Sequence, residues 1–146
     1  MYRFLFAGLL WALPAALAQA EIPAAVLVEP NLEKRSELAL KVADERISAA
    51  SKAYASGASP AEFQEQVRLI GDLAELSLKS LQETGKSANR KPKYFKRAEL
   101  KLRSLLRRMD TLEREVSAED RPPVEKAKAV LTQTHEQILH DIMAKR

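Results

Sequence analysis

The sequence predicts an all-α protein, an antiparallel up-down four-helix bundle that follows a cleaved N-terminal signal peptide. Ala, Leu, Glu, Lys and Arg, which are strong helix formers, dominate the 146 residues. Apolar residues recur three and four positions apart in four separate segments, and Gly or Pro residues separate each segment from the next. No segment shows the alternation of apolar and polar residues that is typical of a strand.

The first 20 residues have the features of a secretory signal peptide. A short basic start that includes Arg3 precedes an unbroken apolar run over residues 4–13. Residues 18–20 (AQA) form the small-x-small pattern of a signal peptidase site, so we expect cleavage after Ala20, with Ala18 as the other candidate. The apolar run is shorter than the roughly 20 residues that span a bilayer, and no later segment is apolar enough to do so. We therefore expect export to a bacterial periplasm or secretion, with no transmembrane span in the mature chain.

An extended leader and the first helix should follow the signal peptide. Residues 21–30 are short, carry two prolines and are expected to be extended. The first helix is expected at about residues 31–56, because Asn31 is a suitable N-cap and Gly57 a suitable C-terminal stop. Leu40, Ile47 and Tyr54 are seven residues apart and mark its apolar stripe.

The second helix, at about residues 60–84, has the clearest start signal in the chain. Residues 59–62 (SPAE) form a capping box with proline at the first helical position. Gly71 lies within this helix and costs about 1 kcal/mol relative to Ala, so we expect a neighbouring helix to approach closely there. The apolar stripe consists of Phe63, Val67, Ile70, Ala74, Ser77 and Leu81.

The third and fourth helices complete a bundle domain that spans residues 31–146. The third, at about residues 92–116, alternates three and four residues between apolar positions over three heptads, which is typical of a packed seam. The fourth, at about residues 121–144, begins where Pro122 and Pro123 prevent an earlier continuous helix. The two stripes are Phe95, Ala98, Leu102, Leu105, Met109, Leu112 and Val116, and then Val124, Ala127, Leu131, Thr134, Ile138 and Ile142.

Residues that support catalysis or metal binding are scarce. The absence of Cys excludes disulfides, thiolate metal sites and thiol nucleophiles. His135 and His140 are five residues apart, so they lie on different faces of a helix and cannot form a helical zinc pair. The seam positions are apolar, so we expect no carboxylate cluster in the core. We therefore expect no enzymatic activity, no metal and no cofactor, with His135 partly buried and structural and His140 solvated.

Residues 85–108 (GKSANRKPKYFKRAELKLRSLLRR) hold ten Lys or Arg residues and one acid, Glu99. On a heptad with Phe95 at position a and Ala98 at position d, the cations fall outside the seam. They also open the third helix while acids close it, which is opposite to the order that the helix dipole favours. We expect the neighbouring helices to leave much of this charge uncompensated. The candidate anion-binding residues are Arg90, Lys91, Lys93, Lys96, Arg97, Lys101, Arg103, Arg107 and Arg108.

The leading hypothesis is a non-enzymatic binding or interaction module whose basic end meets an anionic envelope component or an acidic protein. Because the chain is expected to be exported, we do not expect nucleic acid as its physiological partner. One alternative is a purely structural helical protein whose basic face is solvated. Another is a periplasmic chaperone-like protein that holds unfolded clients. Residues 131–135 (LTQTH) resemble one copy of the Leu-Thr-x-x-Gln repeat of the Spy/CpxP-type periplasmic chaperones, with His135 in place of Gln, and this resemblance implies the second alternative.

Overall fold

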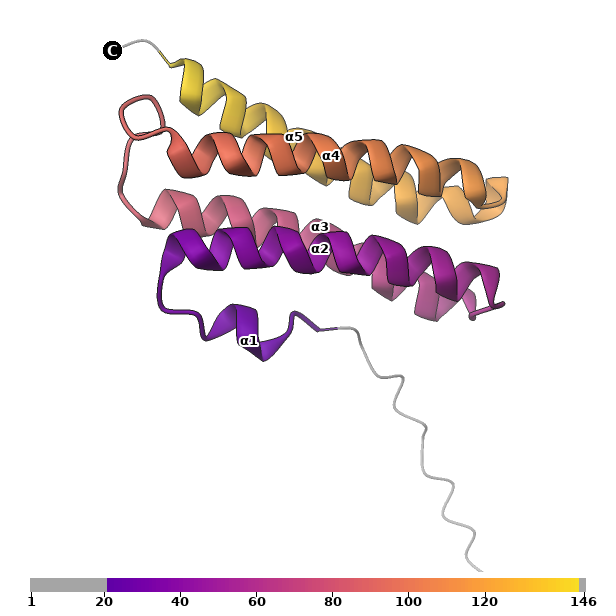
Figure 1. Cartoon of the computed structure of the whole chain (residues 1–146). Helices are drawn as coiled ribbons and strands as arrows, with labels where there is room; N and C mark the ends of the chain where they lie inside the picture. The colour runs from indigo at the N-terminus through magenta and orange to yellow at the C-terminus, as the bar shows by residue number, and fades with distance from the viewer. Residues whose placement is uncertain (1–20, 145–146) are drawn as a thin grey trace, which may run out of the picture.

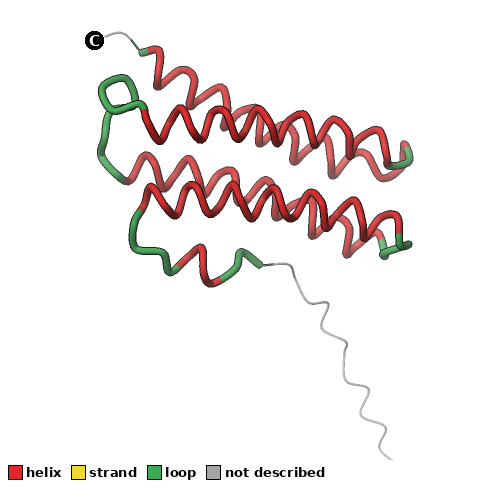
Figure 2. Tube along the Cα trace, viewed as in Figure 1, coloured by secondary structure: helices red, strands yellow, loops and turns green. Residues whose placement is uncertain are grey.

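The computed structural model describes residues 21–144, and the predicted signal peptide lies outside them. Within this range the chain is all-helical and contains no strand, as predicted (Figures 1 and 2). Four long helices pack together, and each begins and ends within one residue of its expected position. They are α2 (Leu32–Ala55), α3 (Pro60–Glu83), α4 (Lys93–Glu115) and α5 (Arg121–Met143).

Local signals set several of the helix ends. The Asn31 side chain accepts a hydrogen bond from the backbone N–H of Lys34 at 2.9 Å and caps α2. Ser59 caps α3 in the same way, through the backbone N–H of Glu62 at 3.3 Å. Gly57 follows the end of α2 by two positions. Its φ of +78° lies in the left-handed region that glycine tolerates best. Before α5 the chain forms a single 3₁₀ turn, η1 (Ala118–Asp120).

The leader is not wholly extended, so this part of the prediction is wrong. Residues Ala24–Leu27 form a one-turn helix, α1, on the side of α2 and α3 that faces away from α4 and α5 (Figure 1). Val26 is fully buried there and joins the hydrophobic core. Arg35 of α2 donates a hydrogen bond to the backbone carbonyl of Glu29 at 2.9 Å. Burial of one apolar side chain and this tie hold the leader against the bundle.

The four helices form two stacked antiparallel hairpins. One hairpin is α2 with α3, the other is α4 with α5, and they stack with α2 against α4 and α3 against α5. Chain direction alternates along the sequence, as expected for an up-down order (Figure 1). In this order α2 and α4 start at the same end of the bundle (Figure 1). Because the hairpins stack with α2 against α4, these two neighbours are parallel. The prediction of an antiparallel bundle therefore holds within each hairpin but not between them.

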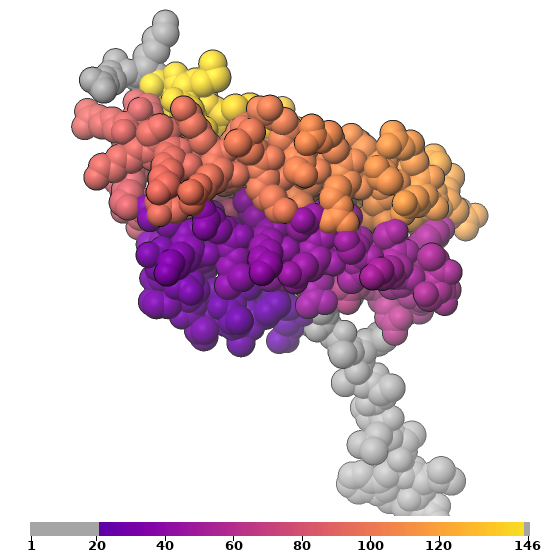
Figure 3. Space-filling model, viewed as in Figure 1, coloured from indigo at the N-terminus to yellow at the C-terminus, as the bar shows by residue number. Residues whose placement is uncertain are grey.

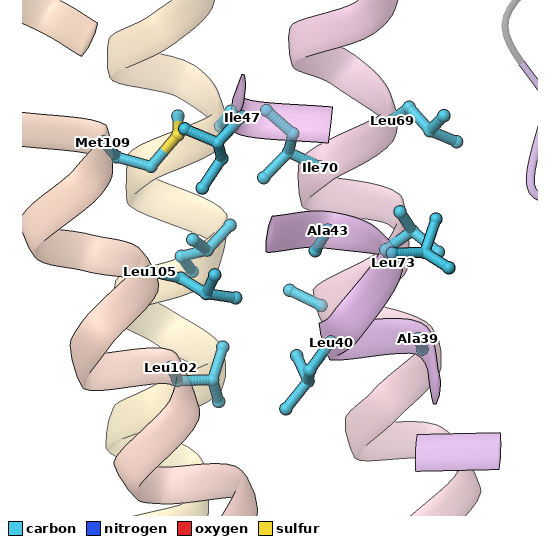
Figure 4. Close-up of a cluster of buried hydrophobic side chains, with 14 of the residues drawn as sticks. Ala39, Leu40, Ala43, Ile47, Leu69, Ile70, Leu73, Leu102, Leu105 and Met109 are labelled. Carbon is cyan, nitrogen blue, oxygen red and sulfur yellow. The ribbon is translucent and has the colours of Figure 1, made fainter. Parts of the chain in front are cut away.

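A single hydrophobic core lies between the hairpins. Buried side chains from α2, α3 and α4 meet at its centre, among them Leu40, Ile70 and Leu105 (Figure 4). Leu131 and Ile138 contribute from α5 and are also fully buried. Because the core is continuous over all four long helices, we expect residues 21–146 to fold on their own.

A neighbouring helix, α5, approaches Gly71 as expected, but the approach is not close enough to require glycine, so it is not the reason for this residue. A Cβ atom built on Gly71 would lie 3.6 Å from the Cβ and Cγ1 atoms of Val130 on α5, which is ordinary van der Waals contact. The neighbouring helix therefore leaves room for a methyl group. The glycine lowers the helix propensity of α3 without a steric reason in the described residues.

We expect Gly71→Ala to raise the free energy of unfolding by about 0.5–1 kcal/mol, because Ala favours the helix and meets no clash. Gly57→Ala serves as the matched control and should lower the free energy of unfolding by about 1 kcal/mol, because its φ of +78° strains a residue with a Cβ. Thermal unfolding followed by circular dichroism measures both. A melting temperature that falls for Gly71→Ala would contradict the packing seen between α3 and α5.

Candidate functional site

The nine cations expected to bind an anion lie in three different environments. Two precede α4 in the connection and are exposed, five are exposed on α4, and two are partly covered by α2. In that order they are Arg90 and Lys91; Lys93, Lys96, Arg97, Arg103 and Arg107; and Lys101 and Arg108.

Lys101 and Arg108 tie α4 to α2 through one carboxylate, that of Asp44. The Lys101 ammonium lies 2.6 Å from Asp44 Oδ2, and Arg108 pairs with Asp44 Oδ1 and donates to the Asp44 backbone carbonyl at 2.8 Å. Burial by itself raises the pKa of Asp44, but hydrogen bonds from Lys101 and Arg108 together with their positive charges bring the pKa below its usual value. These two partly exposed cations therefore tie α4 to α2, and the two helices run together across the face shown in Figure 3.

Two more of the cations also have acidic partners. Arg97 pairs with Glu37 of α2 at 3.0 Å, and Arg103 donates from Nε to Glu99 of its own helix at 3.1 Å. In the Arg97–Glu37 pair both side chains are about half exposed, so this pair contributes little to stability, whereas Arg103 reaches a carboxylate that is buried. The expectation that neighbouring helices leave this charge uncompensated is thus wrong for Arg97, Lys101 and Arg108, whereas the acid partner of Arg103 belongs to α4 itself.

Glu99 is a buried acid that the sequence pattern did not single out as a site. It lies between α4 and α5, where His135 Nε2 is 2.9 Å from its Oε1 atom and Arg103 pairs with the same oxygen. Burial by itself raises the pKa of Glu99, but hydrogen bonds from His135 and Arg103 hold the pKa below its usual value. His135 is partly buried at this contact, whereas His140 is exposed. Glu99 is the one acid in residues 85–108 and follows the seam residue Ala98, and this position is the signal that could have revealed it.

The remaining cations belong to a surface that we call the outer face of α4. It comprises the exposed residues of that helix from Lys93 to Arg114 and contains six cations, and the one exposed acid of the helix, Glu115, follows at its last position. The exposed charged residues of α2 differ, because Lys34, Glu37, Lys41, Glu45 and Lys52 alternate in sign. The outer face consists of Lys93, Lys96, Arg97, Leu100, Arg103, Arg107, Thr111 and Arg114.

Four cations of the outer face form no ion pair with an acid in residues 21–144. They lie along one side of the helix and are Lys93, Lys96, Arg107 and Arg114. Tyr94 lies beside the face, with the Lys93 ammonium 5.4 Å and the Arg97 guanidinium 5.5 Å from the centre of its ring. From its first to its last residue the outer face is about 31 Å long, at about 1.5 Å per residue.

A cavity lies next to the first turn of α4. Its volume is about 180 Å³, and Lys86, Lys91 and Lys93 line it together with Tyr94 and Glu33. Lys86 pairs with Glu33, which offsets part of the positive charge. The cavity extends the basic surface from the outer face towards the connection that holds Arg90 and Lys91.

Neither a metal site nor a membrane-spanning helix is found in the part of the chain that the structure describes. Residues 21–144 contain no group of three or more His, Asp or Glu side chains placed to hold a metal ion. Among the same residues, no helix combines the length and the apolar character that a membrane crossing requires. Comparisons of the chain with protein-family models, with curated proteins and with solved structures find no match.

We expect Asp44→Asn to lower the free energy of unfolding by about 1–2 kcal/mol at neutral pH, because Lys101 and Arg108 lose their shared carboxylate. The pKa of Asp44 is lowered by folding, so its contribution is complete above the unfolded value of about 4 and is lost as the pH falls through the lower folded value. Urea unfolding at neutral pH and near pH 3 should therefore show a difference between wild type and variant that shrinks in acid.

Glu45→Gln is the matched control, because Glu45 is exposed, adjacent to Asp44 and without an ion pair among the described residues. It should change the free energy of unfolding by less than about 0.5 kcal/mol at either pH. A loss for Asp44→Asn that is equally large at neutral and acid pH would show that its charge is not the cause.

Proposed function

We propose that the protein is an exported, non-enzymatic binding module that attracts an anionic partner to the outer face of α4. The observation that carries this proposal is the composition of that face, which holds six cations, while the one exposed acid of α4, Glu115, stands at the last position of the helix. Arg90 and Lys91, in the connection before α4, extend the surface. Such a surface steers anions to one side of the molecule in a salt-dependent way.

The ion pairs of α4 indicate which of the nine candidate anion-binding residues are free to bind a ligand. Lys101 and Arg108 are occupied by Asp44 and cannot turn outwards without breaking contacts with α2. Lys93, Lys96 and Arg107 have no acid partner among the described residues, so their charge is available to a ligand. Arg97 sits between them in an exposed pair with Glu37 that an incoming anion could replace at little cost, whereas Arg103 is held by the buried Glu99.

The fold does not require these outer cations. Exposed positions of a helix contribute little to stability, and Lys93 and Lys96 stand in the first turn, where the helix dipole disfavours positive charge by a few tenths of a kcal/mol each. A solvated face with no ligand would be expected to mix signs, as the exposed residues of α2 do. Anion binding accounts for the excess of one sign.

The chaperone-like alternative has less support from the described surface. A protein that holds unfolded clients needs apolar surface, and residues 21–144 expose four large apolar side chains at three separate places. Leu27 and Val28 are in and after α1, Leu100 is on α4, and Met143 ends α5. The bundle would have to open to offer more.

Binding to immobilised heparin, a soluble polyanion, tests the proposal. The variant Lys93→Gln/Lys96→Gln/Arg107→Gln should elute at lower salt than the wild type, and the slope of log affinity against log salt should fall by about two to three units, roughly one for each cation removed. The matched control is Lys52→Gln/Lys79→Gln/Lys126→Gln, which removes the same charge from exposed positions of α2, α3 and α5.

The two triple variants separate a local site from an effect of net charge. The control is expected to elute close to the wild type. Equal losses in both variants would mean that total charge alone governs retention. No loss in the outer-face variant would mean that the outer face of α4 is not the site.

A further inference from the structure

We propose that the partner of the outer face of α4 is a membrane surface rich in anionic phospholipid, and that Leu100 enters the lipid at the centre of the contact. This inference rests on the proposed function, because it assigns a partner to the same surface. The observation that carries it is the exposure of Leu100 within the outer face, because a soluble anion would have no favourable contact with an apolar side chain.

Leu100 is the one large apolar residue of α4 that the bundle leaves exposed, at 58%. The apolar seam of α4 is buried, from Phe95 at 4% to Leu112 at 1% exposure. Leu100 therefore contributes little to the core, and water surrounds more than half of it. An isolated exposed leucine is ordinary on a protein surface, but this one lies in the middle of a cationic face.

Cations flank Leu100 on both sides along the helix. Lys96 and Arg97 lie one turn before it, and Arg103 lies one turn after it, at the spacing that places side chains on the same face. Arg107 follows after a further turn. Lys and Arg side chains can lay their apolar stems along lipid while their charged groups reach the phosphates. The arrangement of one apolar residue among long cations matches the boundary between headgroups and acyl chains.

A bilayer surface offers both an anionic layer for the cations and an apolar phase for Leu100, whereas a soluble polyanion offers only the negative charge. A polysaccharide or polyphosphate chain would satisfy the cations but would leave Leu100 in water. An anionic leaflet attracts each Lys or Arg near it and also provides an apolar phase just below the headgroups. Tyr94, with its ring against Lys93 and Arg97, supplies a second amphipathic side chain at the edge of the face.

The fold makes this contact peripheral rather than membrane-spanning. The seam of α4 packs into the core, so the helix cannot turn its main apolar stripe towards lipid without unfolding the bundle. One leucine and several cations remain to make the contact. We therefore expect reversible binding that depends on anionic lipid and is released by salt.

Vesicle flotation with residues 21–146 tests the inference. The vesicles contain about one third phosphatidylglycerol in phosphatidylcholine, with pure phosphatidylcholine vesicles as the uncharged comparison. The protein should float with the anionic vesicles and not with the uncharged ones, and salt should release it. Lys93→Gln/Lys96→Gln/Arg107→Gln should reduce binding by about 100-fold, given the attraction expected for each cation at such a surface.

Leu100→Gln distinguishes lipid from other anions. It should reduce vesicle binding by about 5- to 10-fold, because the apolar side chain no longer enters the lipid, and it should leave elution from heparin unchanged. Leu27→Gln is the matched control, since Leu27 is 52% exposed but lies in α1, on the side of α2 and α3 away from α4. It should bind vesicles as the wild type does. Circular dichroism melting verifies that both variants stay folded.

Each other outcome has a defined meaning. Heparin binding without vesicle binding overturns the membrane assignment and leaves the proposed function standing. An outer-face triple variant that binds both heparin and vesicles as the wild type does overturns both. Wild-type vesicle binding by Leu100→Gln overturns the insertion of Leu100, and with it the preference for a membrane over a soluble polyanion or an acidic protein.

Discussion

The charge distribution of this protein depends on the packing of α4 against α2 in the same direction. The connection over residues 84–92 starts α4 beside the start of α2, so the basic stretch of α4 runs beside the part of α2 that carries Glu37 and Asp44. Glu37 then meets Arg97, and Asp44 meets both Lys101 and Arg108. In the opposite direction, Glu37 near the start of α2 would face the end of α4 that carries Asp110 and Glu113, and like charges would meet.

This packing also decides which cations reach solvent. Residues on the α2 side of α4 are used as ties between helices, and Glu99 on the α5 side binds Arg103 and His135. The outer face of α4 lies between these two sides, and most of its cations have no acidic partner among the described residues. The fold therefore divides the basic segment over residues 85–108 into cations that tie α4 to α2 and cations that belong to the outer face.

The sequence was sufficient to predict the helices, because their signals are local. Asn31 and Ser59 cap helices through hydrogen bonds within one turn, and the apolar stripes show which side of each helix is buried. A stripe does not show which helix covers it, so the parallel contacts could not be predicted. Asp44 finds its partners 57 and 64 residues away, a pairing that depends on that missing information. The short helix α1 was missed because one turn, with Val26 as its buried residue, shows no periodicity.

The partial negative charge of neighbouring helix C-termini explains only part of the basic charge of α4 and of the connection before it. The C-terminal ends of α3 and α5 lie beside the start of α4, and their partial negative charge favours nearby cations such as Lys86 and Lys91 (Figure 1). That effect fades within one turn, so it does not reach Arg103 or Arg107 in the middle of α4. Arg103 has Glu99, but Arg107 has no acidic partner in the described residues. The proposed anionic partner of the outer face would supply the counter-charge for Arg107, which neither a helix end nor an ion pair among the described residues supplies.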